Sequence, residues 1–103
     1  MVYFHAGGGY AGSPELASPV VNRYAVEGDV DVVSVKYRLA PEAKAPSGVY
    51  DAYAATKWVI QNAESLGINA KKIGIFGDEA GAMIAAGVGM MLAEKGESHL
   101  VRF

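Results

Sequence analysis

The sequence contains no cysteine, which excludes disulfide bonds and thiolate metal sites. It also lacks an excess of either charge: 9 basic and 11 acidic residues give a net charge of −2, and no basic stripe suited to nucleic acid is present. The longest apolar run, residues 80–93, is shorter than the roughly 20 residues of a membrane-spanning helix. We therefore expect no nucleic-acid partner, membrane span, metal or cofactor. No signal peptide is predicted, and the compartment is left open.

What the 103 residues do contain is a regular alternation of β-branched runs with helical runs. Strands are expected at 2–5, 30–37 and 72–76, helices at 14–26, 49–65 and 79–95, and the first residues of a fourth strand at 99–103. Ser13 is the expected N-cap of the first helix, with Pro14 at its first position. Three strand–helix repeats predict parallel strands with right-handed crossovers, and hence one α/β domain over residues 1–103.

A turn between two glycines gives the strongest functional signal. Gly77 and Gly81 bracket this turn, which follows the apolar strand of residues 73–76 and precedes the third helix. This is the context of a nucleophile elbow, G-x-S-x-G, which presents its middle residue to a cleft from a strained turn. The middle residue here is Glu79, where that pattern has serine. Its neighbour Asp78 is expected to accept backbone N–H groups of the turn.

The carboxylate of Glu79 has two interpretations. As a covalent nucleophile it would form an anhydride with an ester carbonyl, and attack on a saturated carbon would still need a base to activate water. His99, near the end of the chain, is expected to be a solvated surface residue and supplies no such base. In the other interpretation the carboxylate accepts hydrogen bonds at the helix N-terminus, which lowers its pKa below the ordinary value of about 4.3.

The glycine cluster after the first expected strand also has two interpretations. Gly7, Gly9 and Gly12 fit G-x-G-x-x-G, the pattern of a dinucleotide-binding loop, but the acidic residue expected near the end of the next strand is absent. Alternatively, residues 5–8 form an HGGG-type oxyanion loop, in which glycine lets backbone N–H groups approach a developing negative charge. The amides of Gly7 and Gly8 would then be the donors.

Residues 37–42, Tyr-Arg-Leu-Ala-Pro-Glu, together with this loop and the glycine-bracketed turn, resemble the hormone-sensitive-lipase-like α/β-hydrolases. That family carries HGGG, YRLAPE and GDSAGG motifs in this order and at similar spacing, and the resemblance covers nearly the whole chain. It implies the central part of an α/β-hydrolase fold that hydrolyses carboxylic esters, with a small hydrophobic ester as ligand. By position, Gly7, Gly8 and Ala80 resemble the oxyanion donors, and His5 takes the place of the histidine that shapes their loop.

Two departures from the family change the expected function. Glu79 stands in the place of the nucleophilic serine, and the triad Asp and His of the family follow the turn at a distance that lies beyond residue 103. We therefore expect an internal piece of the fold, related to esterases and lipases but catalytically impaired. An active hydrolase that uses Glu79 remains the alternative. Both edges of the sheet are expected to be exposed, which favours self-association.

The other residues of the third helix are interpreted as structural. Gly81, Ala85 and Gly89 are expected to form a stripe of small residues that lets the helix approach the sheet. Met83, Met90 and Met91 are expected to fill the core, because methionine adapts to irregular gaps.

Overall fold

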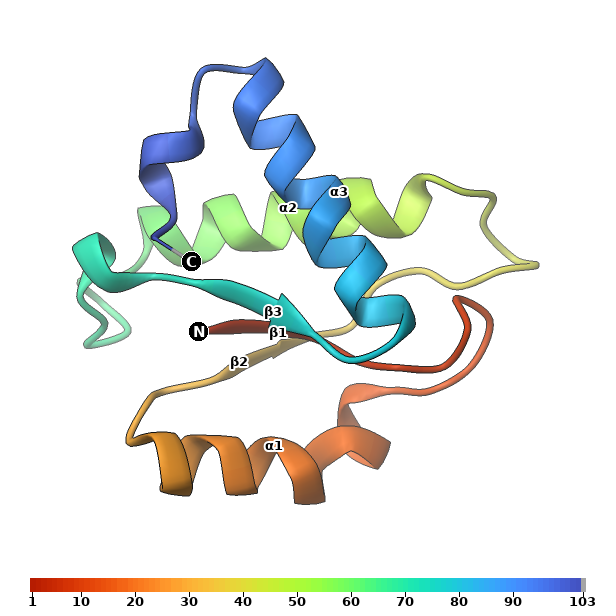
Figure 1. Ribbon diagram of the computed structural model, residues 1–103, viewed down its shortest axis with the longest axis horizontal. Helices are drawn as coiled ribbons and strands as arrows, with labels where there is room; N and C mark the ends of the chain where they lie inside the picture. The colour runs from red at the N-terminus through yellow and green to blue at the C-terminus, as the bar shows by residue number, and fades with distance from the viewer. Residues whose placement is uncertain (103) are drawn as a thin grey trace.

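The computed structural model describes residues 1–102, and its strands and helices alternate as the sequence predicts (Figure 1). The elements are β1 (Val2–Phe4), α1 (Pro14–Gly28), β2 (Val33–Val35), α2 (Ser47–Gln61), β3 (Ile75–Gly77) and α3 (Ala80–Glu94). Two short 3₁₀ helices, η1 (Ala70–Lys72) and η2 (Ser98–Leu100), precede β3 and follow α3. No helix in this described part of the chain is both long and apolar enough to cross a membrane.

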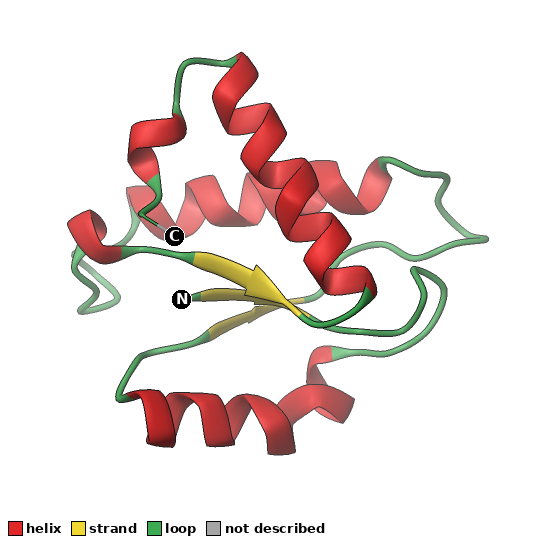
Figure 2. Cartoon of the chain, in the orientation of Figure 1, coloured by secondary structure: helices red, strands yellow, loops and turns green. Residues whose placement is uncertain are grey.

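The three strands are parallel and lie in the order β2-β1-β3. Phe4 of β1 lies opposite Val35 of β2 and Gly77 of β3. Helix α1 covers one face of this sheet, and α2 and α3 cover the other (Figure 2). From β1 the chain crosses over to β2 on one side of β1, and from β2 it crosses over to β3 on the other side of β1. The carboxyl ends of β1 and β3 therefore form the switch point at which α/β sheets hold their ligands.

The apolar core lies between the sheet and the layer formed by α2 and α3. Val2 and Phe4 of β1 are both 0% exposed, and they belong to one buried cluster with Val59, Val88 and Leu92. Tyr3 lies between them in the strand and therefore turns to the opposite face, where its ring contacts that of Tyr24 in α1. The two faces of β1 thus meet different surroundings.

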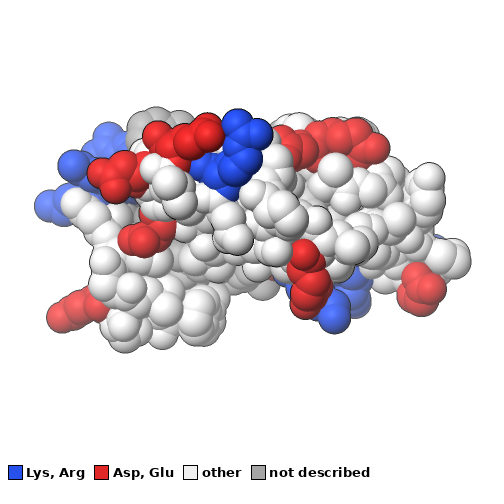
Figure 3. Space-filling view, turned by 90° about the horizontal axis from the view of Figure 1, so that it is seen from below, with Lys and Arg blue, Asp and Glu red and all other residues white. Residues whose placement is uncertain are grey.

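Helix α1 begins at the cap that the sequence predicts. The hydroxyl of Ser13 accepts a hydrogen bond from the amide of Leu16 at 3.1 Å, and Pro14 opens the helix. The helix ends after Gly28, where Asp29 adopts the left-handed conformation with φ 49°. Seen from the α1 side, acidic and basic side chains form small separate groups without a broad basic area (Figure 3).

Several expected boundaries move. The strand expected at 30–37 pairs only over β2, because its partner β1 has three residues. Helix α2 begins two residues earlier than expected and ends at Gln61, four before the expected end. The side-chain amide of Asn62 donates to the carbonyl of Trp58 at 2.8 Å, and residues 62–67 then form turns. A polar side chain that competes for helix carbonyls thus ends the helix before the apolar pattern does.

The fourth strand expected at 99–103 is not present in the described residues, where η2 forms instead. The amide of Arg102 nevertheless donates to the carbonyl of Ile73 at 2.8 Å. The next carbonyl, that of Gly74, accepts from β1. Because successive carbonyls of an extended chain point to opposite sides, Arg102 lies beside the edge of β3 that faces away from β1. Phe103, the last residue of the expected strand, lies outside the described residues.

Helix α3 turns only part of the expected face to its neighbours. Gly81 is buried against the end of β1 and Ala85 packs against the core, as expected. Met83 and Met90 are 75% and 66% exposed, so the prediction that they fill the core is wrong. Gly89 faces open space, whereas a Cβ on Gly87 would lie 2.8 Å from a methyl group of Val49 in α2. The helix is apolar on all sides, so its sequence pattern does not indicate which side is buried.

Candidate active site

The turn after β3 holds Glu79 in a strained backbone conformation. Glu79 has φ 53° and ψ −111°, a combination that residues other than glycine rarely adopt. It is the N-cap residue of α3, and its own carboxylate accepts a hydrogen bond from the amide of Ala80. The chain thus places a carboxylate at the positive end of a helix, at the switch point of the sheet.

Gly77 and Gly81 are sterically required by this turn. A Cβ on Gly81 would lie 1.9 Å from the carbonyl oxygen of Phe4, and a Cβ on Gly77 would lie 2.4 Å from the carbonyl of Gly81. Real Cβ atoms essentially never come closer than 3.0 Å to such neighbours. Helix α3 therefore begins directly against the end of β1. The shape of the turn is set by main-chain contacts and not by the side chain at position 79.

The glycine loop after β1 closes over the same point. The amides of Gly7 and Gly8 donate to Oε2 of Glu79 at 3.3 and 3.0 Å, and the amide of Ala80 donates to the same oxygen. Gly8 has φ 65°, in the left-handed region that favours glycine. The structure thus brings together the three predicted donors and Glu79, although the loop and the turn lie 71 to 72 residues apart in the chain.

These hydrogen bonds decide the charge of Glu79. The amides of Gly8, Ala80 and Gly7, in that order, lower the pKa of Glu79 below its usual value, because they stabilise the ionised form. Desolvation, which would raise the pKa, has the smaller effect because the side chain is exposed. Glu79 is therefore a carboxylate at neutral pH, as the second interpretation of the sequence predicts.

His5 is buried and bonded within the loop. Its Nδ1 lies 2.7 Å from the carbonyl oxygen of Ala6 and acts as the donor, since a carbonyl only accepts. Its ring stacks on that of Tyr37 with centroids 4.4 Å apart, and the hydroxyl of Tyr37 donates to the carbonyl of His5 at 2.5 Å. His99 is exposed in η2. Within residues 1–102, neither histidine is hydrogen-bonded to Glu79.

Asp78 does not bond the turn in the way that the sequence suggests. Its carboxylate accepts hydrogen bonds from the hydroxyl of Tyr3 at 3.0 Å and from that of Tyr24 at 3.2 Å. The expectation that it accepts backbone N–H groups of the turn is therefore wrong. Two tyrosine hydroxyls on the α1 side of the sheet lie within reach, and phenol groups are good donors to a carboxylate. The two neighbouring carboxylates thus accept hydrogen bonds on opposite sides of the turn, Asp78 on the α1 side and Glu79 from the glycine loop.

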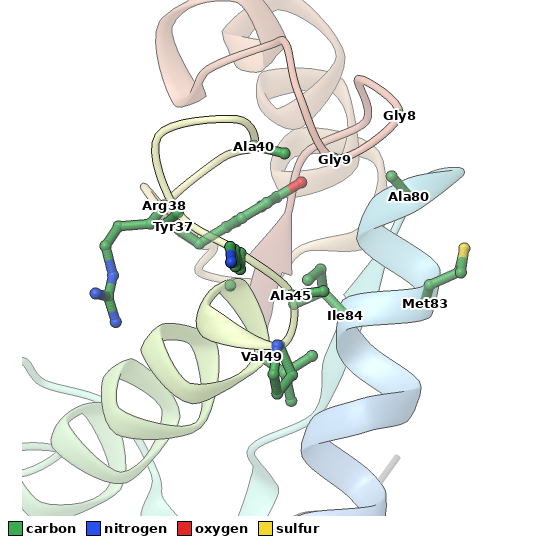
Figure 4. Close-up of a pocket in the computed structure, with 14 residues that line it drawn as sticks. Gly8, Gly9, Tyr37, Arg38, Ala40, Ala45, Val49, Ala80, Met83 and Ile84 are labelled. Carbon is green, nitrogen blue, oxygen red and sulfur yellow. The ribbon is translucent and has the colours of Figure 1, made fainter.

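A pocket of about 350 Å³ lies beside the donors of Glu79. Gly8 and Ala80 form part of its wall, and Figure 4 shows the side chains of Val49 and Ile84 on neighbouring helices with Tyr37 reaching toward the glycine loop. Burial raises the pKa of Tyr37, and the negative charge of Glu79 adds a smaller increase. The sequence does not predict this pocket, because helices from different parts of the chain form its apolar wall.

Two basic residues border the pocket. Arg38 is paired with Asp51, with Nε and Oδ2 2.8 Å apart, and its side chain points away from the pocket in Figure 4. Lys44 lines the pocket and forms no ion pair within the described residues. In the same part of the chain, no group of three or more His, Cys, Asp or Glu side chains is placed to hold a metal ion.

Nothing in this arrangement favours the dinucleotide interpretation of the glycine loop. The amides of Gly7 and Gly8 are directed to the carboxylate of Glu79. Helix α1 begins at its separate cap, Ser13, so its N-terminus does not open from the glycines. Gly12 has a local packing role, because a Cβ there would lie 2.7 Å from Nδ1 of His5.

Comparison with known proteins agrees with this geometry. The family model described as the alpha/beta hydrolase fold matches residues 1–103. The chain is 41% identical over 101 residues to the Carboxylesterase NlhH of Mycobacterium tuberculosis, a match that covers 98% of this chain and 32% of that protein. It is also 41% identical over 98 residues to the Arylacetamide deacetylase of Bos taurus, covering 91% of this chain and 25% of that protein.

A solved structure matches equally well. A hyperthermophilic esterase from the archaeon Pyrobaculum calidifontis has 46% sequence identity and a TM-score of 0.94, over 98% of this chain and 32% of that one. The chain therefore spans a quarter to a third of the length of these relatives. The match of the family model over all residues and the identity to carboxylesterases show that the chain belongs to the α/β-hydrolase-fold family, in its hormone-sensitive-lipase-like branch.

Proposed function

We propose that this chain binds small hydrophobic esters without hydrolysing them as a serine esterase does. The observation that carries the proposal is that the carboxylate of Glu79 accepts hydrogen bonds from the N–H groups of Gly7, Gly8 and Ala80. By the motif resemblance, position 79 corresponds to the family's nucleophile. By position, Gly7, Gly8 and Ala80 resemble the donors that stabilise the tetrahedral oxyanion in family members. A carboxylate that occupies them leaves no donors for a developing negative charge.

The chemistry of the site supports loss of turnover. Removal of the serine from a triad of this kind lowers turnover on the order of 10⁶-fold. Glu79 is a poor substitute, because its pKa is lowered by its hydrogen bonds and it would form an anhydride with an ester carbonyl. In the described part of the chain, His5 is buried and hydrogen-bonded to Ala6, so it is not available to activate water for Glu79.

The pocket supports retained binding. Its volume lies in the range of small-molecule sites, and its wall includes the apolar side chains of Val49, Ile84 and Tyr37. The relatives are named carboxylesterase, esterase and deacetylase, which makes esters the ligand class of first choice. A neutral ester would place its alkyl part in the pocket and its carbonyl near the glycine loop.

Turnover of p-nitrophenyl butyrate by the purified chain tests the first half of the proposal. We expect no turnover above background in the native chain or in Glu79→Ala. Turnover in the native chain that Glu79→Ala abolishes would establish the active-hydrolase alternative. Turnover that survives Glu79→Ala would come from another site.

Binding of ethyl butyrate, followed by NMR, tests the second half. We expect the methyl signals of Val49 and Ile84 to shift on titration. A Gly48→Leu variant should reduce these shifts, because a Cβ on Gly48 would already lie 3.2 Å from the side chains of Tyr37 and Ile84. Leu16→Ala, a change on the exposed surface of α1, is the matched control. Unchanged methyl signals in the native chain would contradict ester binding.

A further inference from the structure

We propose that the amides of Gly7, Gly8 and Ala80 form a binding site for the carboxylate of an apolar monocarboxylic acid, and that Glu79 is the chain's own competitor for it. The proposal rests on the proposed function, since the acid would place its apolar part in the same pocket. This proposal differs from the proposed function in two ways. The ligand is an acid and not an ester, and Glu79 blocks a binding site in addition to standing in the place of a nucleophile.

The donors form a built site and not merely a helix end. Two of them come from the glycine loop after β1 and one from the start of α3, and all three converge on a single carboxylate oxygen. The steric contacts of Gly77 and Gly81 with their neighbours hold the turn against the sheet whatever side chain stands at position 79. The amide of Ala80 would thus remain in place after the carboxylate of Glu79 has moved away, and the glycine loop is held by its own hydrogen bonds from the amides of Tyr10 and Ala11 to the carbonyl of Gly7.

The charges around the site favour an anion once Glu79 is displaced. The carboxylate of Asp78 is taken up by Tyr3 and Tyr24 on the α1 side of the sheet. Asp51 is paired with Arg38. Lys44 lines the pocket without an ion pair in the described residues, and the N-terminus of α3 adds a partial positive charge.

The pocket determines what the acid carries. Its wall beside Gly8 and Ala80 is largely apolar, which suits an alkyl or aryl group, and its volume of about 350 Å³ has room for one. A carboxylate on the three amides and an apolar group among Val49 and Ile84 would use both parts of the site. The ligand class is therefore an apolar monocarboxylate.

Glu79 is able to leave the site. Its side chain is exposed, and the three hydrogen bonds all go to Oε2. Because it is attached to the same chain, however, it acts at a high effective concentration and disfavours an external carboxylate. The native chain should therefore bind monocarboxylates weakly, and a chain that lacks this side chain should bind them more tightly.

Titration of the full chain with sodium hexanoate, followed by ¹⁵N NMR, tests the proposal. We compare the native chain with Glu79→Ala and with Glu79→Gly, which suits the positive φ at this position and protects the test against misfolding. Both variants should bind hexanoate at least tenfold more tightly than the native chain, with the largest shifts at the amides of Gly7, Gly8 and Ala80. Glu64→Ala, which removes an exposed carboxylate elsewhere, should behave as the native chain does.

Two further measurements decide what the titration means. Hexanamide, a neutral ligand with the same alkyl chain, should gain less affinity than hexanoate in the Glu79 variants. Folded Glu79 variants that bind hexanoate no more tightly than the native chain, or an equal gain for hexanamide, would overturn the carboxylate site. Ester turnover that depends on Glu79 would overturn only the proposed function, so failures of the two proposals are distinguishable.

Discussion

The two faces of the sheet are covered in different ways. On one face α2 and α3 contribute buried residues to the core, namely Ala52, Thr56, Val59, Ala80, Gly81, Val88 and Leu92. On the other face α1 contributes Val21, while its Leu16 and Val26 are 77% and 81% exposed. The hydrophobic free energy of folding therefore comes mainly from the α2 and α3 side.

The α1 face is held by polar and aromatic contacts instead. Tyr3 and Tyr24 share the carboxylate of Asp78, and the ring of Tyr24 packs against that of Phe76 with centroids 5.5 Å apart. These contacts end at the turn that carries Glu79. One face thus supplies stability by apolar burial, while the other adds directional bonds that fix the position of the site.

The largest expected effect comes from breaking the contact between α3 and the sheet. Gly81→Ala should destabilise the chain by at least about 3 kcal/mol or prevent folding, because its Cβ would lie 1.9 Å from the carbonyl oxygen of Phe4. Gly89→Ala in the same helix meets open space and should stabilise the chain by about 0.5–1 kcal/mol. Urea unfolding followed by circular dichroism measures both, and equal effects would contradict the steric account.

A matched pair of leucines compares the two faces directly. Leu92→Ala in α3 should cost about 2–5 kcal/mol, because this side chain is 1% exposed in the core. Leu16→Ala in α1 removes the same atoms from a side chain that is 77% exposed and should change stability by less than about 0.5 kcal/mol. A comparable loss in both variants, measured by urea unfolding, would show that α1 buries more apolar surface than the structure indicates.

The directional bonds of the α1 face are tested by removing one hydroxyl. Tyr3→Phe leaves the packing of this buried ring and deletes its hydrogen bond to Asp78, so we expect a loss of about 1 kcal/mol. Tyr10→Phe, on a side chain that is 70% exposed, should have no measurable effect. An unaltered unfolding midpoint for Tyr3→Phe would remove the polar network as a source of stability.

The smallest effect on stability is expected from removing the charge of Glu79, in the turn between β3 and α3. The folded pKa of Glu79 is lowered, so its stabilising contribution is present above the unfolded pKa of about 4.3 and is lost as the pH falls through the folded pKa. Glu79→Gln should thus lower stability near neutral pH and flatten its decline in acid. Asp51, whose pKa is lowered by Arg38, contributes in the same window, so part of the decline should persist.

Unfolding midpoints at pH 7 and pH 3 for the native chain, Glu79→Gln and Asp51→Asn measure this dependence. A NMR titration of the native chain gives the pKa of Glu79 itself. A pKa above the ordinary value, or an identical acid decline in Glu79→Gln, would contradict the hydrogen bonds seen at this carboxylate.

The sequence predicts the architecture well because strands and helices alternate and because capping residues, proline and glycine mark their ends. Ser13 and Pro14 mark the start of α1, and glycines bracket the turn before α3. Boundaries are less predictable where a side chain competes with the backbone, as Asn62 does at the end of α2. The orientation of α3 was also unpredictable, because it is apolar all round and places Met83 in solvent.

The contacts of the candidate site were predictable only in part. The glycine motifs were enough to predict that Gly7 and Gly8 lie close to Glu79, because the loop and the turn follow neighbouring parallel strands. The partners of Asp78 were not predictable, since they depend on Tyr24, which lies 54 residues away on another helix. The pocket was not predictable either, because its walls come from segments far apart in the chain, mainly the loop before α2 and α3.

The steric fit of Gly77 and Gly81 against the end of β1 has an evolutionary consequence. Because main-chain atoms shape this turn, the side chain at position 79 can change without loss of the steric contacts that hold the turn against β1. We therefore expect a single codon change at position 79 to alter the chemistry of the turn while Gly77 and Gly81 preserve its shape. The shape of the turn and the chemistry of its central side chain are then expected to vary independently in evolution.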